Sequence, residues 1–319
     1  VWDLDNTSSI CPSCTQGCNI KVDTRDNLVT RLRPRHNAHV NSYWMCDHGR
    51  RNYDWLNRTD RVEVPLVRDE TGRLIAANWQ QAIRALVDRL GSVRGRDATI
   101  VGSPYQANED NGLLARLAEV LGAGSMLFRS PRAEDEVPCP GFAKLARRRD
   151  LAANVRGLEE LGFSRVGDDE AAGGLATAPG AVLIVLADEL VDAPPEFGAD
   201  AALFVVLGHA LSRAARNAHF ILPVTTFAEQ EGTFTNFERR VQRFWPALQP
   251  PPLARPAWQV LGVLLAGLDD GPAPADAASA FLRLGSWSDP FRGLSYEMLG
   301  ARGALLNEPV RLAGAGREN

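Results

Sequence analysis

Residues 11–18 have the sequence CPSCTQGC, which places three cysteines in one short turn near the start of the chain. A fourth, Cys46, follows after 27 further residues, so the full pattern is C-x2-C-x3-C-x27-C. Four of the five cysteines therefore fall within the first 46 residues. Such clustering is typical of a metal site in a reducing compartment and not of a disulfide framework.

The division of the ligands into three plus one favours an iron–sulfur cluster. Each of the four irons of a cubane takes one terminal thiolate, and three of these can come from one loop while the fourth comes from elsewhere. The spacing therefore predicts a [4Fe–4S] cluster bound by Cys11, Cys14, Cys18 and Cys46. Structural zinc usually draws its ligands as two separate pairs, so a zinc site is the weaker alternative, and thiols gathered by chance are the weakest.

Other residues near these cysteines suit the same interpretation. Pro12 fixes one backbone angle and Gly17 permits a tight turn, which leaves N–H groups free to face the sulfurs. His36, His39 and His48 lie close by in the sequence. Because four cysteines already complete the ligand set, we interpret these histidines as groups at the surface or beside the site.

Composition excludes several functional classes. The 319-residue chain carries 35 basic and 39 acidic residues, a net charge of -4, and its charges of both signs are interspersed. A nucleic-acid partner is not expected, because binding nucleic acid requires a basic surface. The longest apolar run, near residues 260–268, is well short of the ~18 residues of a membrane span, and no leader is recognised. We expect a globular chain that is held at a membrane only through partners. Its electron relay is expected to depend on another chain or on a missing N-terminal part of a longer subunit.

Hydrophobic patterns predict a small β-rich lobe followed by an α/β region. Residues 19–35 alternate between apolar and polar side chains, which indicates two strands joined by a turn at residues 24–27. Helical spacing predicts a helix that starts at Asn78 and stops at Gly91. A buried strand at 97–102, a helix at 108–123 and a strand at 125–128 follow, and this βαβ rhythm indicates a parallel sheet.

Three later apolar runs predict further buried strands, at residues 180–190, 201–208 and 218–224. We interpret them as a second sheet region. Residues 150–179 are predicted to be helices or a mobile connection, and a helix is expected near residues 258–268 in the proline-rich tail. The predicted division is a cluster-binding domain at residues 1–62 and an α/β scaffold at 63–319, with 150–180 as a connection between two possible subdomains.

Three segments resemble a known family. ICPSCTQGCNI (10–20), followed by MCDHGRRNYDWLNRTDRVEVPLVRD (45–69), resembles the cluster-binding domain of the molybdopterin oxidoreductase superfamily, and more closely the family of the large iron–sulfur subunit (the G-subunit) of bacterial NADH-quinone oxidoreductase, respiratory complex I. AHFILPVTTFAEQEGTFTNFERRVQRF (218–244) and DPFRGLSYEMLGARG (289–303) are similar to segments of the same families. The resemblance implies an α/β fold: a small β-rich [4Fe-4S] lobe followed by Rossmann-like α/β domains of the molybdopterin oxidoreductase type, reduced in size.

The resemblance also implies roles for individual residues. The four cysteines carry over as cluster ligands, and no residue is assigned a catalytic role. Catalytic relatives often have a Lys two positions after the last cluster cysteine, where this chain has His48. Cys139, between two prolines, is interpreted as structural, with a cofactor role as the weaker alternative. Gly232 is expected to serve a turn and Asn236 a local hydrogen bond.

The leading hypothesis is an electron-transfer and scaffold subunit of NADH-quinone oxidoreductase that carries one [4Fe–4S] cluster and no catalytic molybdopterin. It would be an enzyme only within its complex, on the cytoplasmic side of the inner membrane, with cluster-bearing and NADH-oxidising subunits as partners. One alternative is a catalytic molybdopterin oxidoreductase of the formate dehydrogenase or nitrate reductase type. Another is a structural assembly module with a structural metal site.

Two smaller features receive structural interpretations. Trp44, Tyr53 and Trp55 flank Cys46 and are expected to exclude water and fill the small core. The run ARRRD, at residues 146–150, is expected to be a solvated face or a partner contact.

Overall fold

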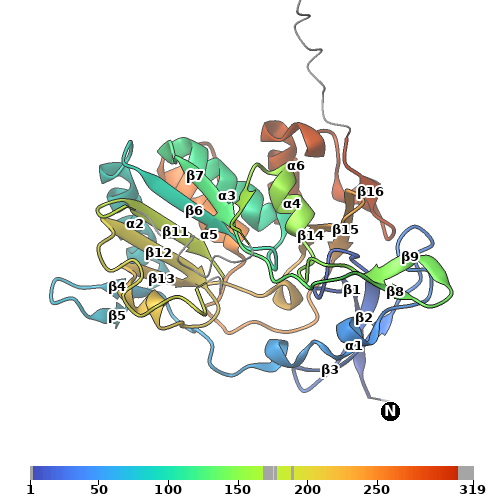
Figure 1. Cartoon of the computed structure of the whole chain (residues 1–319). Helices are drawn as coiled ribbons and strands as arrows, with labels where there is room; N and C mark the ends of the chain where they lie inside the picture. Colours follow the sequence, from blue (N-terminus) through green and yellow to red (C-terminus); the bar gives the residue numbers. More distant parts are fainter. Residues whose placement is uncertain (1–2, 168–174, 176–177, 188–189, 308–319) are drawn as a thin grey trace, which may run out of the picture.

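The computed structural model describes residues 3–167, 175, 178–187 and 190–307 of the chain (Figure 1). Its strands are β1 Asp5–Ile10, β2 Asn19–Arg25, β3 Leu28–Pro34, β4 Leu66–Arg68, β5 Leu74–Ala76, β6 Ala98–Gly102, β7 Ser125–Phe128, β8 Val137–Cys139, β9 Phe142–Arg147, β10 Ser164–Arg165, β11 Val182–Leu186, β12 Leu203–Gly208, β13 Phe220–Pro223, β14 Gly232–Thr235, β15 Arg240–Phe244 and β16 Ala304–Leu305. Its α-helices are α1 Asp47–Arg51, α2 Trp79–Ser92, α3 Asn108–Leu121, α4 Val155–Glu160, α5 Ala257–Gly267, α6 Ala277–Trp287 and α7 Tyr296–Leu299. Short 3-10 helices are η1 Asp54–Asn57, η3 Ala214–Asn217, η4 Phe227–Glu229 and η5 Asp289–Phe291.

The N-terminal lobe is built on an antiparallel sheet in the order β1-β2-β3. Its two predicted strands are present, and the turn between them places Asp26 and Asn27 at φ angles of 51° and 60°. Positive φ at both central positions is the conformation of a two-residue turn whose twist matches that of the flanking strands. The sequence prediction of a β-rich lobe is therefore confirmed.

A single eight-stranded sheet forms the body, in the order β10-β7-β6-β11-β12-β13-β4-β5. The strands from β10 to β13 are parallel, and β4 and β5 extend the edge antiparallel. The three later apolar runs are strands as predicted, but the second sheet region is wrong, because β11 pairs directly with β6. From the adjacent strands β6 and β11, the chain continues to β7 on one side of the sheet and to β12 on the other. In the sequence, these two groups of strands resemble two separate sheets.

Both faces of this sheet are buried, which explains its continuous apolar strands. Val182, Ile184 and Leu186 of β11 pack on the face with α2, α3, α5 and α6, whereas Leu183 and Val185 belong to a second cluster on the other face. Side chains alternate between faces along a strand, so a strand covered on both sides must be apolar at every position. No helix in the described part of the chain is long and apolar enough to cross a membrane.

The helix predicted from Asn78 is α2, and Asn78 caps it by accepting a hydrogen bond from the N–H of Gln81 at 2.9 Å. The predicted stop at Gly91 is wrong by a residue, because α2 continues to Ser92 and the cap position is Val93. The predicted helix near 258–268 is α5. Within the connection at 150–180, the described residues include α4 and β10, and residues 168–174 and 176–177 lie outside the described part.

A buried polar cluster joins α3 to the segment around β14. Both oxygens of the Glu109 carboxylate accept hydrogen bonds, from the N–H of Thr233 at 2.9 Å, its hydroxyl at 3.0 Å and the Tyr296 hydroxyl at 2.8 Å. Asp110 accepts from the N–H of Trp258 at 2.7 Å, which satisfies a donor in the first turn of α5. Gly232 begins β14, and a Cβ there would lie 2.8 Å from the Cβ of Ala107. Its predicted turn role is wrong, since close packing is what requires glycine.

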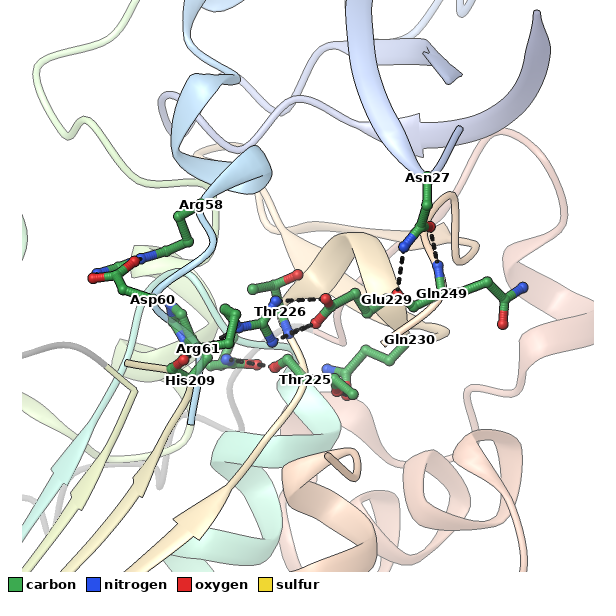
Figure 2. A network of polar contacts seen from close by, with 11 residues as sticks. Asn27, Arg58, Asp60, Arg61, His209, Thr225, Thr226, Glu229, Gln230 and Gln249 are labelled. Atoms are coloured by element: carbon green, nitrogen blue, oxygen red, sulfur yellow. Dashed lines mark hydrogen bonds and ion pairs between the residues drawn. The ribbon is translucent and has the colours of Figure 1, made fainter. Parts of the chain in front are cut away.

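The lobe and the body are connected by a buried ion pair, shown in Figure 2. The Arg61 guanidinium donates to both carboxylate oxygens of Glu229 at 2.6 and 2.9 Å, and its Nε donates to the His209 carbonyl at 3.1 Å. The side chains of Arg61 and Glu229 are only 8% and 4% exposed. Glu229 also accepts from the N–H of Thr226. The predicted domain boundary after residue 62 lies one residue beyond Arg61. It stays a prediction.

We predict that Arg61→Met lowers the free energy of unfolding by about 3–5 kcal/mol, because it leaves the Glu229 carboxylate buried without its counter-charge. Chemical denaturation of the purified chain measures this. Arg292→Met is the control, since Arg292 and Asp289 form an exposed pair whose loss costs about 1 kcal/mol or less. Equal losses in the two variants would contradict the assigned role of the Arg61–Glu229 pair.

Glu109 predicts a pH dependence of stability. Burial, with a smaller contribution from the nearby Asp110, raises the pKa of Glu109 from 4.5 to about 8. The native state therefore favours protonated Glu109. The contribution of this protonated group to the free energy of unfolding is complete below pH 4.5 and is lost as the pH rises towards 8. Gln does not titrate, so the free energy of unfolding of Glu109→Gln should increase by about 1–3 kcal/mol relative to that of the wild type when the pH is raised from 5 to 8. Urea unfolding at both pH values tests this; Glu119→Gln, on the exposed side of α3, should show no such gain.

Candidate metal centre

The loop at residues 11–18, called the cluster loop below, connects β1 to β2. A hydrogen bond from the N–H of Cys11 to the carbonyl of Cys18 closes its base at 2.8 Å. Gly17 has a φ of 62°, and a Cβ there would lie 2.8 Å from Nε2 of Gln242. Both observations confirm that this position needs glycine.

Cys46 reaches the cluster loop from the start of α1. It occupies the N-cap position, where its Sγ accepts a hydrogen bond from the N–H of Gly49 at 3.4 Å. A Cβ on Gly49 would lie 2.8 Å from the Sγ of Cys11 and 3.7 Å from that of Cys46. Both sulfurs therefore approach the same point above Gly49. This glycine was missed as a site residue, although it stands among the three residues that follow Cys46.

The four predicted ligands form one group. Cys11, Cys14 and Cys18 are 4–5% exposed, whereas Cys46 is half-buried. Each thiol interacts electrostatically with the other three. The fold thus brings a residue 28 positions along the chain from Cys18 to the loop that holds the other three cysteines.

Burial makes the thiolate forms of these cysteines unfavourable in the protein alone. It raises the pKa of Cys11 to about 12, with Cys14 as the next cause, and it also raises the pKa values of Cys14 and Cys18. Repulsion among the sulfurs adds to the effect of burial at all three. Thiolates held together in a dry site need a cation to compensate their charge, so this donor set suits a metal group.

Backbone and side-chain donors face the sulfurs. The backbone and hydroxyl of Ser13 lie beside the Cys11 sulfur and partly offset the rise in the pKa of that thiol. At Cys14 the backbone N–H groups of Arg148 and Gln16 and the charge of Arg148 act in the same direction. Arg148 comes from the run that was expected to be a solvated face or a partner contact. The solvated face is wrong for Arg148, whose side chain is 15% exposed, and a partner contact stays a prediction.

The β8–β9 hairpin covers one side of the cluster loop. Leu145 of β9 is buried in the same apolar cluster as Cys11 and Cys18, and Cys139 of β8 packs against that cluster. Cys139 also interacts electrostatically with Cys18 and Cys46. The structure therefore brings the fifth cysteine to the other four, which its distance in sequence gave no reason to expect.

Of the remaining predicted neighbours, Tyr53 and Trp55 pack against the apolar cluster of Cys11 and Cys18, whereas the histidines and Trp44 lie at the surface. His36, His39 and His48 are exposed, as interpreted from the sequence. Trp44 is 51% exposed and packs against Phe142, so its expected role in the interior is wrong. Among the described residues, no group of three or more histidine, cysteine or acidic side chains lies close enough to hold a single metal ion, the four cysteines included. A four-iron cluster needs only one thiolate at each iron, so this spacing suits a cluster better than one zinc ion.

Comparison with known proteins follows this geometry. Residues 5–58 match the molybdopterin oxidoreductase Fe4S4 domain, and residues 151–266 match molybdopterin oxidoreductase. The chain is similar to the molybdopterin oxidoreductases in these two segments. The predicted resemblance to that superfamily and the predicted [4Fe–4S] cofactor are confirmed by these matches.

Curated relatives of the chain agree with the narrower resemblance to the large iron–sulfur subunit of NADH-quinone oxidoreductase. NADH-quinone oxidoreductase subunit 3 of Thermus thermophilus is 36% identical over 129 residues, which are 40% of this chain and 16% of that protein. The NADH-quinone oxidoreductase G-subunit of Rickettsia felis is 28% identical over 194 residues, which are 56% of this chain and 28% of that protein. The matches thus span less than a third of either relative's length.

The fold is also shared with a solved structure. Acetylene hydratase from Pelobacter acetylenicus aligns with a TM-score of 0.56 over 91% of this chain and 73% of that chain, at 11% identity. At this identity the comparison concerns the fold alone. Together with the two family matches, it confirms the predicted α/β fold of the molybdopterin oxidoreductase type.

The ligand set predicts different effects for two cysteine substitutions. Cys46→Ser should lose most of the bound iron, because it removes one of the four thiolates. Cys139→Ser should keep the iron content of the wild type, since four cysteines remain for the cluster. Iron and labile sulfide are measured after anaerobic purification. Iron loss in Cys139→Ser with retention in Cys46→Ser would assign the fourth ligand to Cys139 and refute the prediction.

Proposed function

We propose that this chain is part of an electron-transfer subunit of NADH-quinone oxidoreductase. Cys11, Cys14, Cys18 and Cys46 bind one [4Fe–4S] cluster, and the α/β body is a scaffold without a catalytic molybdopterin. The observation that carries the proposal is the convergence of Cys46 with the buried cysteines of the cluster loop. Similarity to two subunits of NADH-quinone oxidoreductase supports the choice of complex.

The residues around the site suit electron transfer without bond-making chemistry. When bound, the cluster supplies one-electron exchange. The N–H groups of Ser13, Gln16 and Gly49 compensate sulfur charge, and the apolar side chains that enclose the loop exclude water. Such a site needs to hold its ligands in the same positions in both oxidation states.

Partners and location follow from the same proposal. Cluster-bearing and NADH-oxidising subunits of the complex would deliver the electrons, and hydride chemistry would belong to them. The chain would lie on the cytoplasmic side of the inner membrane and reach it only through these partners.

A catalytic molybdopterin enzyme is the second candidate, because one cavity lies where α/β folds bind ligands. This cavity, of about 760 Å³, is lined by Ser103, Ala187 and His209, which follow the carboxyl ends of β6, β11 and β12. His48, in place of the Lys of catalytic relatives, favours the non-catalytic proposal. Finding molybdenum or tungsten together with pterin in anaerobically purified protein would decide for the second candidate.

We predict that the anaerobically purified chain contains about four irons and about four sulfides and gives a paramagnetic signal on one-electron reduction. The physical reason is that four thiolates match four irons. Metal analysis and electron paramagnetic resonance measure both quantities. One tightly bound zinc per chain, with no reducible signal, would refute the proposed function and favour a structural assembly module.

A further inference from the structure

The guanidinium of Arg148 is held in one place beside the cluster loop. Its Nε donates to Oε1 of Gln16 at 2.9 Å, its Nη1 to Oε2 of Glu136 at 2.9 Å and its Nη2 to the Lys144 carbonyl at 3.1 Å. Its Cζ lies 3.7 Å from the centre of the Phe237 ring. All three nitrogens of the guanidinium are thus engaged, and one face of its plane is covered.

The contacts of Arg148 continue directly to the predicted ligands. Gln16 is 1% exposed, belongs to the cluster loop and also donates to the Val40 carbonyl at 3.1 Å. The backbone N–H of Arg148 lies beside the Cys14 sulfur and lowers the pKa of that thiol. The same residue therefore touches the loop through its main chain and holds a positive charge next to it through its side chain.

The surrounding segments fix this position from both sides. Phe237 donates its N–H to the Thr15 carbonyl at 2.8 Å, and Thr15 donates its own N–H to the Asp150 carbonyl at 3.0 Å. Phe237, which covers the guanidinium, and Asp150, two positions after Arg148, are thus both hydrogen-bonded to the cluster loop. A charge held in this way cannot rotate into solvent when the charge of the neighbouring site changes.

We propose that Arg148 raises the reduction potential of the group bound at the cluster loop, and that Glu136 opposes it. This inference rests on the proposed function. Reduction adds one negative charge to the site, and a fixed cation in a poorly solvated environment stabilises the more negative state. Glu136 is paired with Arg148, and because its side chain is 46% exposed, solvent screens its opposing charge more strongly.

The two charges predict potential shifts of opposite sign. Arg148→Gln should lower the potential, with about a tenfold fall in the ratio of reduced to oxidised cluster at a fixed potential, which is about 59 mV for one electron. Glu136→Gln should raise the potential by a smaller amount. Arg148→Lys keeps the positive charge, so its reduction potential should stay close to that of the wild type.

The experiment is a redox titration of the full 319-residue chain, followed by electron paramagnetic resonance, with iron and sulfide measured for every variant. Arg149→Gln is the matched control, because it removes the same charge from the exposed neighbouring residue, which donates to the Ala133 carbonyl away from the cluster loop. Its potential should stay close to that of the wild type.

The outcomes separate this inference from the proposed function. Opposite shifts in Arg148→Gln and Glu136→Gln, with Arg149→Gln unchanged, support it. Equal potentials in all variants, or a rise in Arg148→Gln from water entering the site, overturn it while leaving the proposed function intact. If Arg148→Gln does not retain iron, the sign of the Glu136→Gln shift decides. Wild-type protein without iron overturns both.

Discussion

The cost of placing sulfur charges in a dry site is the constraint on which the N-terminal half of the structure depends. Burial and mutual repulsion make thiolates at Cys11, Cys14 and Cys18 unfavourable until a metal group compensates them. Hydrogen-bond donors lie beside the sulfurs and lower this cost, and apolar side chains around the loop exclude water. Metal binding and the ordering of the loop are therefore expected to be coupled.

The rest of the chain supplies what the loop cannot supply alone. The β8–β9 hairpin and Arg148 pack against the loop. The segment from β14 to β15 contacts it as well, through Phe237 and Gln242, which donate to the carbonyls of Thr15 and Gly17. In Figure 1 the β8–β9 hairpin and the strands β14 and β15, far apart in sequence, lie near β1. These later segments of the chain therefore help to hold the cluster loop in its conformation.

The same logic explains a family segment that persists in this chain. Within residues 229–236, Glu229 pairs with Arg61, Thr233 binds Glu109, and Asn236 accepts from the N–H groups of Glu238 and Arg240. These contacts join the segment to Arg61 and to α3, and they shape the turn before β15. The segment is therefore retained by packing and hydrogen bonding whether or not a cofactor lies beside it.

The sequence by itself determined the ligand spacing, the strands around the loop, the α2 and α3 helices and the apolar strands of the body. These follow from short-range rules, because spacing, capping and periodicity act within a few residues. Sequence reasoning predicted two sheet regions where β11 pairs with β6, and it assigned Arg148 and Trp44 to the wrong environments. Only the tertiary structure decided that Cys139, Gly49 and Arg148 meet the cluster loop. Their positions depend on contacts between distant segments, whose energies are set by packing and burial and leave no periodic trace along the chain.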